Sequence, residues 1–202
     1  NNKFGYGRVN AGKAVQLAKT HTRLAAEKAT LWSGVGVYAE QPVALAQEIP
    51  DNSKAGTSIT INVAEDIKVE AAQFKLSVAN AEFNFGEDTA EGYVQTTAGM
   101  DLAIEVISPA GTRSVLLSSK QALIYPALDE NFNDMPGSIL KDNVFLSNAF
   151  YGESAKGTWT IRFFDVNGAE VDSQGGILDV DKYVNNTTPS LVQGVALRVF
   201  GH

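Results

Sequence analysis

The sequence predicts an all-β protein, an antiparallel jelly-roll sandwich or barrel with a short N-terminal helical segment. Three observations predict this fold. Apolar and polar residues alternate strictly in several runs after residue 55, clusters of Gly, Pro, Asn and Asp separate these runs, and helical periodicity is confined to the start of the chain. Strict alternation is typical of strands with one buried and one solvated face.

The helical segment precedes the β region. Apolar residues including Val15 and Leu17 recur at helical spacing in Ala11–Lys19, and Asn10 stands at the position of an N-cap. A loop-like passage, Trp32–Ile49, follows it. Separated from a larger body, this helix would expose Val15 and Leu17, so we expect it to be poorly anchored, or packed on a neighbouring molecule or on the β domain.

Five longer strands are predicted from period-two alternation, and these are Ile59–Val63, Phe74–Val78, Leu102–Val106, Trp159–Phe163 and Val195–Val199. Two shorter candidates are Val115–Leu117 and Val144–Leu146. Because Trp159 alternates with polar residues, we expect it to fill the core rather than to form an exposed sugar-binding platform.

Composition excludes several classes of protein. Of 202 residues, 44 % are apolar and 19 % charged, which is ordinary for a globular protein and unlike a disordered chain. The absence of cysteine excludes disulfide scaffolds and thiol chemistry. A net charge of −7 argues against nucleic acid and anionic membranes as partners. No apolar run approaches the ~20 residues of a membrane-spanning helix. The chain begins with Asn1, and we interpret it as a piece of a longer, processed protein.

No catalytic residue is predicted in this chain. Gly7–Ala14 nearly matches a phosphate-binding loop, but Ala14 stands where the metal-binding hydroxyl is needed, which favours a glycine turn entering the helix. Ser58 ends a Gly-Thr-Ser tripeptide like the nucleophile motif of subtilisin-like proteases, but it opens a strand instead of a helix. The only histidines are His21, expected to be solvated near the helix end, and His202, expected to be frayed.

A calcium site is the one metal site that the sequence suggests. Oxygen-bearing side chains recur in one acidic segment, at Asp129, Asn131, Asn133 and Asp134. Asp134 stands where a helix–loop–helix calcium site needs glycine, and Leu140 stands where it needs a bidentate glutamate. The segment therefore predicts a looser Ca²⁺ site in a β-loop, with a solvated acidic turn as the alternative. No other cofactor is predicted.

Three collinear segments of the β region carry a family resemblance. They are Asp101–Leu116, which contains Ser108-Pro109-Ala110-Gly111-Thr112, then Tyr151–Asp165, which contains Tyr151-Gly152-Glu153 and Gly157-Thr158-Trp159, and finally Val195–Gly201. They resemble the P domain of kexin-like and furin-like proprotein convertases, which also follows the catalytic domain of many bacterial subtilisin-like proteases. Phe4–Val15 is similar to the end of such a catalytic domain. Tyr151 replaces the family's usual tryptophan, and residues 172–193 form a longer connection than usual, with a glycosylation sequon at Asn186.

The resemblance implies a domain organisation and a role. Residues 1–31 would be the tail of a catalytic domain, 32–55 a connector and 56–202 the P domain. Such a domain carries no catalytic group, has the subtilisin-like catalytic domain of the same parent as its partner, and stabilises and modulates it. The parent would be secreted, extracellular or periplasmic, and kexin-type members cleave after basic residues.

The resemblance also implies roles for single residues. The segment from Ser108 to Thr112 would form a turn with a positive φ at Gly111, and Glu153 and Asp165 would accept hydrogen bonds from backbone amides. Two rival functions remain open: a carbohydrate- or surface-binding jelly-roll module, and a self-contained hydrolase.

Overall fold

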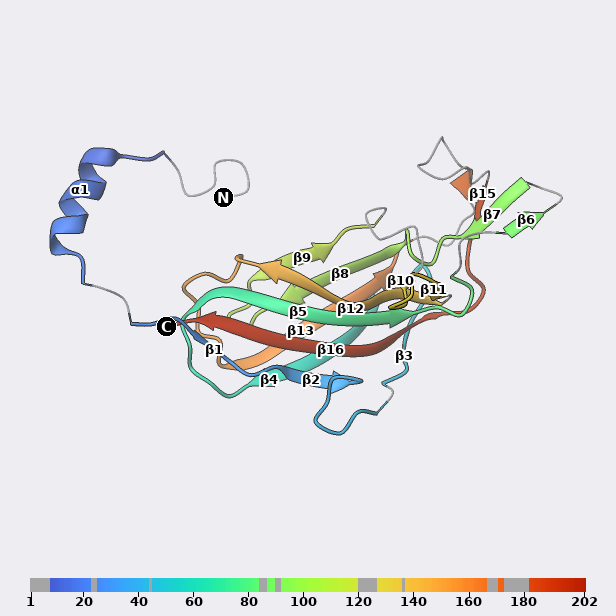
Figure 1. Cartoon of the computed structure of the whole chain (residues 1–202), viewed down its shortest axis with the longest axis horizontal. Helices are drawn as coiled ribbons and strands as arrows, with labels where there is room; N and C mark the ends of the chain where they lie inside the picture. The colour runs from blue at the N-terminus through green and yellow to red at the C-terminus, as the bar shows by residue number, and fades with distance from the viewer. Residues whose placement is uncertain are drawn as a thin grey trace.

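The structure is a computed structural model that describes residues 8–22, 25–43, 45–83, 87–89, 92–119, 127–135, 137–166, 171–172 and 182–202. Its main body is a sandwich of two β-sheets, from which a single helix stands apart on the N-terminal side (Figure 1). In the described part of the chain, no helix has the length and hydropathy needed to span a membrane.

The helix α1 spans Ala11–Thr20. The strands of the two main sheets are β1 (Lys28–Ala29), β2 (Ser33–Gly36), β3 (Gln47–Ile49), β4 (Thr57–Val63), β5 (Val69–Ala79), β8 (Leu102–Ile107), β9 (Arg113–Leu117), β12 (Ser138–Ser147), β13 (Gly157–Asp165) and β16 (Ser190–Gly201). Smaller additions are β6 (Glu87–Thr89), β7 (Gly92–Thr96), β10 (Ala127–Leu128), β11 (Asp134–Met135), β14 (Val171–Asp172) and β15 (Lys182–Val184).

The first main sheet has six strands and the second has four. In the six-stranded sheet the order is β1-β16-β5-β12, and β2 and β3 also pair with β16. In the four-stranded sheet the order is β4-β13-β8-β9. All strand pairs of both sheets are antiparallel, which confirms the predicted fold class. A smaller sheet, β14-β15-β7-β6, contains the parallel pair β15–β7.

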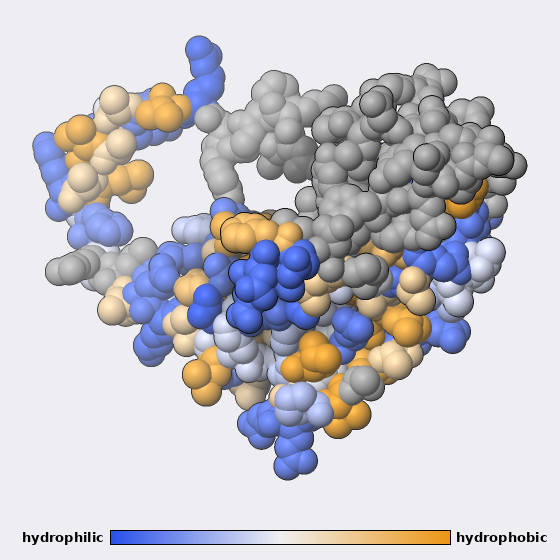
Figure 2. Space-filling view, turned by 45° about the vertical axis from the view of Figure 1, so that its right-hand side comes forward, coloured by the Kyte–Doolittle hydropathy of each residue, from blue (hydrophilic) through white to orange (hydrophobic). Residues whose placement is uncertain are grey.

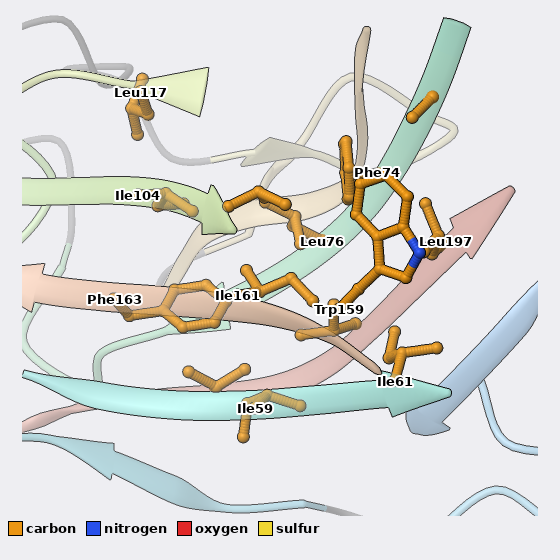
Figure 3. Packing of buried hydrophobic residues seen from close by; sticks show 14 of the residues in the cluster. Ile59, Ile61, Phe74, Leu76, Ile104, Leu117, Trp159, Ile161, Phe163 and Leu197 are labelled. Carbon is orange, nitrogen blue, oxygen red and sulfur yellow. The ribbon is translucent and has the colours of Figure 1, made fainter. Parts of the chain in front are cut away.

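The core lies between the two main sheets, where the predicted apolar sides of the strands meet (Figure 3). Trp159 is fully buried, as predicted. Its ring lies edge-on to Phe150 at a centroid distance of 4.8 Å, and its Nε1 donates to the Ala155 carbonyl oxygen at 2.8 Å. An indole without this partner would leave a buried donor unsatisfied, so the hydrogen bond allows the largest side chain to occupy the core.

Each predicted strand is present, and in the five longer strands the period-two alternation predicts the buried face correctly. In the two shorter strands it does not, because Val115, Val144 and Leu146 are 47 %, 50 % and 60 % exposed. In β4, Ile59, Ile61 and Val63 are buried while the residues between them are exposed. The prediction that Trp32–Ile49 is loop-like is partly wrong, because this segment contains β2 and β3. These short strands have no clear alternation, and they form by hydrogen bonding along the edge of β16.

Helix α1 starts where the sequence predicts. The Asn10 side chain accepts a hydrogen bond from the Lys13 backbone nitrogen at 3.0 Å, which confirms the N-cap. No residue of α1 is buried, and Val15 and Leu17 are 59 % and 68 % exposed. Figure 2 shows apolar and polar surface side by side on the helical part of the molecule, at the left of the view. Among the described residues, none covers the apolar side of α1 enough to bury a residue of the helix.

Candidate functional site

Two of the three segments that carry the family resemblance, Asp101–Leu116 and Tyr151–Asp165, meet at one carboxylate. Glu153, in the loop between β12 and β13, accepts a hydrogen bond from Ser108 Oγ to its Oε2 at 2.6 Å. Its other oxygen, Oε1, accepts from the Thr112 hydroxyl. The expectation that Glu153 binds backbone amides is therefore wrong for its carboxylate, which binds two side-chain hydroxyls of the β8–β9 turn. A carboxylate reaches hydroxyls with short, charge-assisted hydrogen bonds, and this pair ties the two segments together.

The turn itself has the predicted form. The Ser108 backbone nitrogen donates to the Thr112 carbonyl oxygen at 2.9 Å, and Gly111 has a φ of +88°. Gly157 opens β13 beside this turn with a φ of +128°, and a Cβ atom there would lie 2.8 Å from the Pro109 Cβ. The glycine therefore permits close packing of the two loops.

Asp165 ends β13 and is 2 % exposed. Its carbonyl oxygen accepts a hydrogen bond from the Ser53 backbone nitrogen at 3.2 Å. The residue therefore fastens the turn before β4 to the end of β13.

The predicted calcium ligands lie around the hairpin loop between β10 and β11. The Asp129 carboxylate accepts hydrogen bonds from the backbone nitrogens of Asn131 and Asn133, each at 2.8 Å, and from Asn133 Nδ2 at 3.0 Å. The side-chain and backbone hydrogen bonds from Asn133, together with that from Asn131, lower the pKa of Asp129. Asp134 is the first residue of β11, and its side chain lies outside the described residues.

The described residues contain no cluster of three or more His, Asp or Glu that could hold a metal ion. The calcium site thus stays a prediction, and the observed role of Asp129 is to close its own loop.

The residues considered for catalysis lie apart in the fold. Ser58 is exposed on β4 and pairs with Arg162 of β13. His21 is exposed after α1. The prediction that His202 is frayed is wrong. Its backbone exchanges hydrogen bonds with Lys68, and its Nε2 lies 2.9 Å from Glu70 Oε1. The hydrogen bonds found among the described residues join neither histidine to a serine.

The sequon at Asn186 lies in a closed part of the structure. Asn186 is 3 % exposed, and its Nδ2 donates to the Thr188 carbonyl oxygen at 2.8 Å. The Glu82 carboxylate accepts hydrogen bonds from the backbone nitrogen and the hydroxyl of both Thr187 and Thr188. Burial alone would raise the pKa of Glu82, but the hydrogen bonds from Thr188 and Thr187 outweigh it and lower the pKa. This carboxylate therefore clamps residues 187–188 against the loop after β5.

The segment predicted to be a connector is fastened to the outer face of the six-stranded sheet by Tyr38. Its hydroxyl donates to Asp142 Oδ1 at 2.8 Å and lies 2.6 Å from Ser77 Oγ. Burial raises the pKa of Tyr38 to about 12, the hydrogen bond with Ser77 acts against this rise, and the Asp142 carboxylate adds to it. The connector also buries Ile49 completely at β3. The segment is thus bound to the sheet along much of its length.

Comparisons with known proteins agree with this architecture. Residues 89–179 match the sequence model of the proprotein convertase P-domain. The chain is 33 % identical over 209 aligned residues to the Aeromonas extracellular serine protease of Aeromonas sobria, covering 98 % of this chain and 30 % of that protein. It is 28 % identical over 181 residues to Homo sapiens neuroendocrine convertase 2, covering 88 % of this chain and 23 % of the convertase.

A solved structure shows the same fold. The crystal structure of the Aeromonas sobria serine protease in complex with its chaperone superposes with a TM-score of 0.70 at 32 % identity, covering 98 % of this chain and 31 % of that one. These likenesses place the β-sandwich among the domains carried by subtilisin-like serine proteases. More narrowly, residues 89–179 match the proprotein convertase P-domain, so the sandwich is similar to that kind of domain. The chain spans about a third or less of the length of these relatives.

Proposed function

We propose that this chain is the P-domain end of a longer, secreted subtilisin-like serine endopeptidase and stabilises the protease domain without supplying a catalytic group. The observation that carries the proposal is helix α1, whose Val15 and Leu17 are exposed and which has no buried residue. An amphipathic helix gains its stability by burying its apolar side against another element. A protease domain preceding the sandwich is the body that would cover it.

The domain boundaries belong to the same proposal. Residues 1–31 are the tail of the protease domain, 32–55 the connector and 56–202 the P domain. Residues 21–27 connect α1 to β1, and so short a segment, fully extended, spans at most roughly 25 Å. A protease domain that contains α1 is thereby held close to the sandwich.

The mechanism is interfacial burial with a tether. A surface that binds only the folded protease domain stabilises that domain by mass action, and the tether gives it a high effective concentration. Modulation of the protease by pH or Ca²⁺ would act through the same interface. Cleavage after basic residues would be a property of the protease domain, and fluorogenic peptides with basic and non-basic residues would test it in the whole protein.

The experiment compares the full-length parent protease with a version that ends at residue 27. We expect the truncated enzyme to have a lower Tm and a shorter half-life of activity at elevated temperature. Equal stability of the two would contradict a stabilising role. Export of the parent from its cells, followed by immunodetection in the medium and the periplasm, tests secretion.

The rival functions have separate tests. The purified 202-residue chain, incubated with casein and a serine-directed fluorophosphonate, should show no hydrolysis and no labelled serine. Retention on a polysaccharide column would favour the sugar-binding alternative. The chain has two tryptophans that a sugar-binding platform could use. Trp159 is buried, and the ring centroid of Trp32 lies 4.7 Å from the Arg198 guanidinium carbon.

A further inference from the structure

The outer face of the four-stranded sheet is polar and exposed to solvent along β4. Its β4 strand exposes only small polar residues between the buried ones, namely Ser58, Thr60 and Asn62. A shallow hollow of about 320 Å³ lies at the β8–β9 edge, but Glu105 within it binds both Arg113 and Arg162. The charges of this hollow are therefore satisfied within the sheet.

The outer face of the six-stranded sheet differs, and strand register defines it. Leu146 of β12 lies opposite Gln73 of β5, which lies opposite Arg198 of β16. The row beside it contains Val144 and Lys75. Directly opposite residues share a face, and the residues that alternate with them, such as Phe74 and Leu197, are fully buried in the core. Val144 and Leu146 are 50 % and 60 % exposed.

Aromatic rings and cations complete this face. The Arg198 guanidinium carbon lies 4.7 Å from the centroid of Trp32 and 4.8 Å from that of Phe200, and Lys75 Nζ lies 5.2 Å from that of Trp32. Among the residues that the structure describes, no carboxylate forms an ion pair with Lys75 or Arg198. We name the set Trp32, Lys75, Val144, Leu146, Arg198 and Phe200 the cationic face.

The composition of the cationic face indicates a protein partner. Aromatic residues and arginine are enriched in the centres of protein interfaces, and here they adjoin exposed aliphatic side chains. Two cations without carboxylate partners, on a chain of net charge −7, favour a partner that presents carboxylates. Trp32 also follows β1 closely, so this face is near the point where the segment from α1 joins the sandwich (Figure 1).

We propose that the cationic face is the surface on which the protease domain that contains α1 docks, and that this domain presents carboxylates among apolar side chains there. The inference rests on the function proposed above and adds its location and chemistry. Desolvated Lys75 and Arg198 would pair with those carboxylates, while Val144, Leu146 and the aromatic rings exclude water around them.

The test uses charge reversal in the full-length parent protease. Lys75→Glu with Arg198→Glu, and separately Leu146→Glu, should each lower the Tm of the protease by about 3 °C or more and shorten its half-life at elevated temperature. The loss from the charge reversals should shrink at high salt. Lys54→Glu and Lys156→Glu, at exposed lysines before β4 and β13, are matched controls that should leave the Tm unchanged.

Two further measurements separate the outcomes. The Tm of each variant in the 202-residue chain alone shows whether the sandwich still folds, and Leu146→Glu, at an exposed site, should leave it unchanged. If the interface variants stay as stable as wild type while truncation at residue 27 destabilises the protease, the cationic face is refuted and the stabilising function stands. If truncation has no effect, the proposed function fails and this inference fails with it. Sedimentation velocity of the 202-residue chain tests a second copy as the occupant of the cationic face. A dimer that Leu146→Glu dissociates would show that this face binds another copy of the chain, and would overturn the inference.

Discussion

The contact between Glu153 and the β8–β9 turn gives the sharpest prediction about stability. Glu153→Ala removes the acceptor of the Ser108 and Thr112 hydroxyls. Hydrogen bonds to a charged group contribute roughly 1.5–3 kcal/mol each. Ser108 is only 3 % exposed, so water cannot fully replace its lost partner. Glu153 is itself half-buried, so water screens part of its interaction with the two hydroxyls in the folded state. We therefore expect a total loss of about 2–4 kcal/mol.

The turn should keep its shape in this variant. Ser108 Oγ still accepts a hydrogen bond from the Thr112 backbone nitrogen at 3.1 Å, and the backbone pair between these residues is unchanged. The loss should therefore come from separation of the two loops and not from unfolding of the turn. Urea unfolding of the 202-residue chain, followed by tryptophan fluorescence and far-UV circular dichroism, measures the free energy of unfolding.

A double-mutant cycle with Thr112→Val isolates the interaction from other effects of the substitutions. If the two groups interact as the structure shows, the double variant should lose about 1–2 kcal/mol less than the sum of the single variants. Glu65→Ala, at an exposed glutamate, is the matched control and should change the free energy by less than about 0.5 kcal/mol. Additivity of Glu153→Ala and Thr112→Val within about 0.3–0.5 kcal/mol would refute the reasoning.

Three other predictions rest on contacts in the structure, and a fourth tests the calcium site that the sequence predicts. Trp159→Phe removes the indole donor to Ala155 and leaves a void in the core, so the free energy of unfolding in urea should fall by about 2–4 kcal/mol with little change in the m-value. Tyr38→Phe removes the hydroxyl shared by Ser77 and Asp142 and should cost about 1 kcal/mol at neutral pH; in a 295 nm titration it should delete the tyrosine that ionises near pH 12. Since the pKa of Glu82 is lowered on folding, its stabilising effect is present above the unfolded-state pKa near 4.5 and is lost as the pH falls through the folded-state value, so Glu82→Gln should reduce stability at pH 7 and match wild type at the acidic end of a series of urea titrations. Calcium bound at Asp129, Asn131, Asn133 and Asp134 would raise the Tm of the chain when CaCl2 is added, Asp129→Asn should abolish that rise, and an unchanged wild-type Tm in calcium would reject the site.

Strand positions were predictable because burial between two sheets imposes period two on the sequence. The alternation at Ile59, Ile61 and Val63 records which side of β4 faces the core, and the structure confirms it. The same holds for Trp159, whose spacing between polar residues predicts its burial. The turn from Ser108 to Thr112 was predictable for another reason, since proline and glycine restrict or extend the local backbone conformations.

Features that depend on contacts between distant residues were not predictable. The short strands β2 and β3 form because β16 offers an edge, and three or four residues carry too little alternation to show it. The partners of Glu153 lie more than 40 residues away in the sequence, and only the meeting of two loops shows that they are hydroxyls. His202 is held by Lys68 and Glu70 of the neighbouring strand region, which a general expectation of fraying at chain ends misses. The residues of the cationic face come from three strands and the connector, so their common surface follows only from the register.

The attachment of the connector determines how the sandwich could act on a neighbouring domain. Strands β1, β2 and β3 pair with β16, and Tyr38 binds Ser77 and Asp142, so residues after Lys28 are fixed to the sheet. In sequence, only seven residues, 21–27, then separate the end of α1 from the first strand paired with β16. The effective concentration of two linked surfaces falls roughly as the −3/2 power of linker length, so a tether shortened by docking keeps the proposed interface at high effective concentration. Under the proposed function, hydrogen bonds that lie wholly within the P domain therefore strengthen a contact in which they take no direct part.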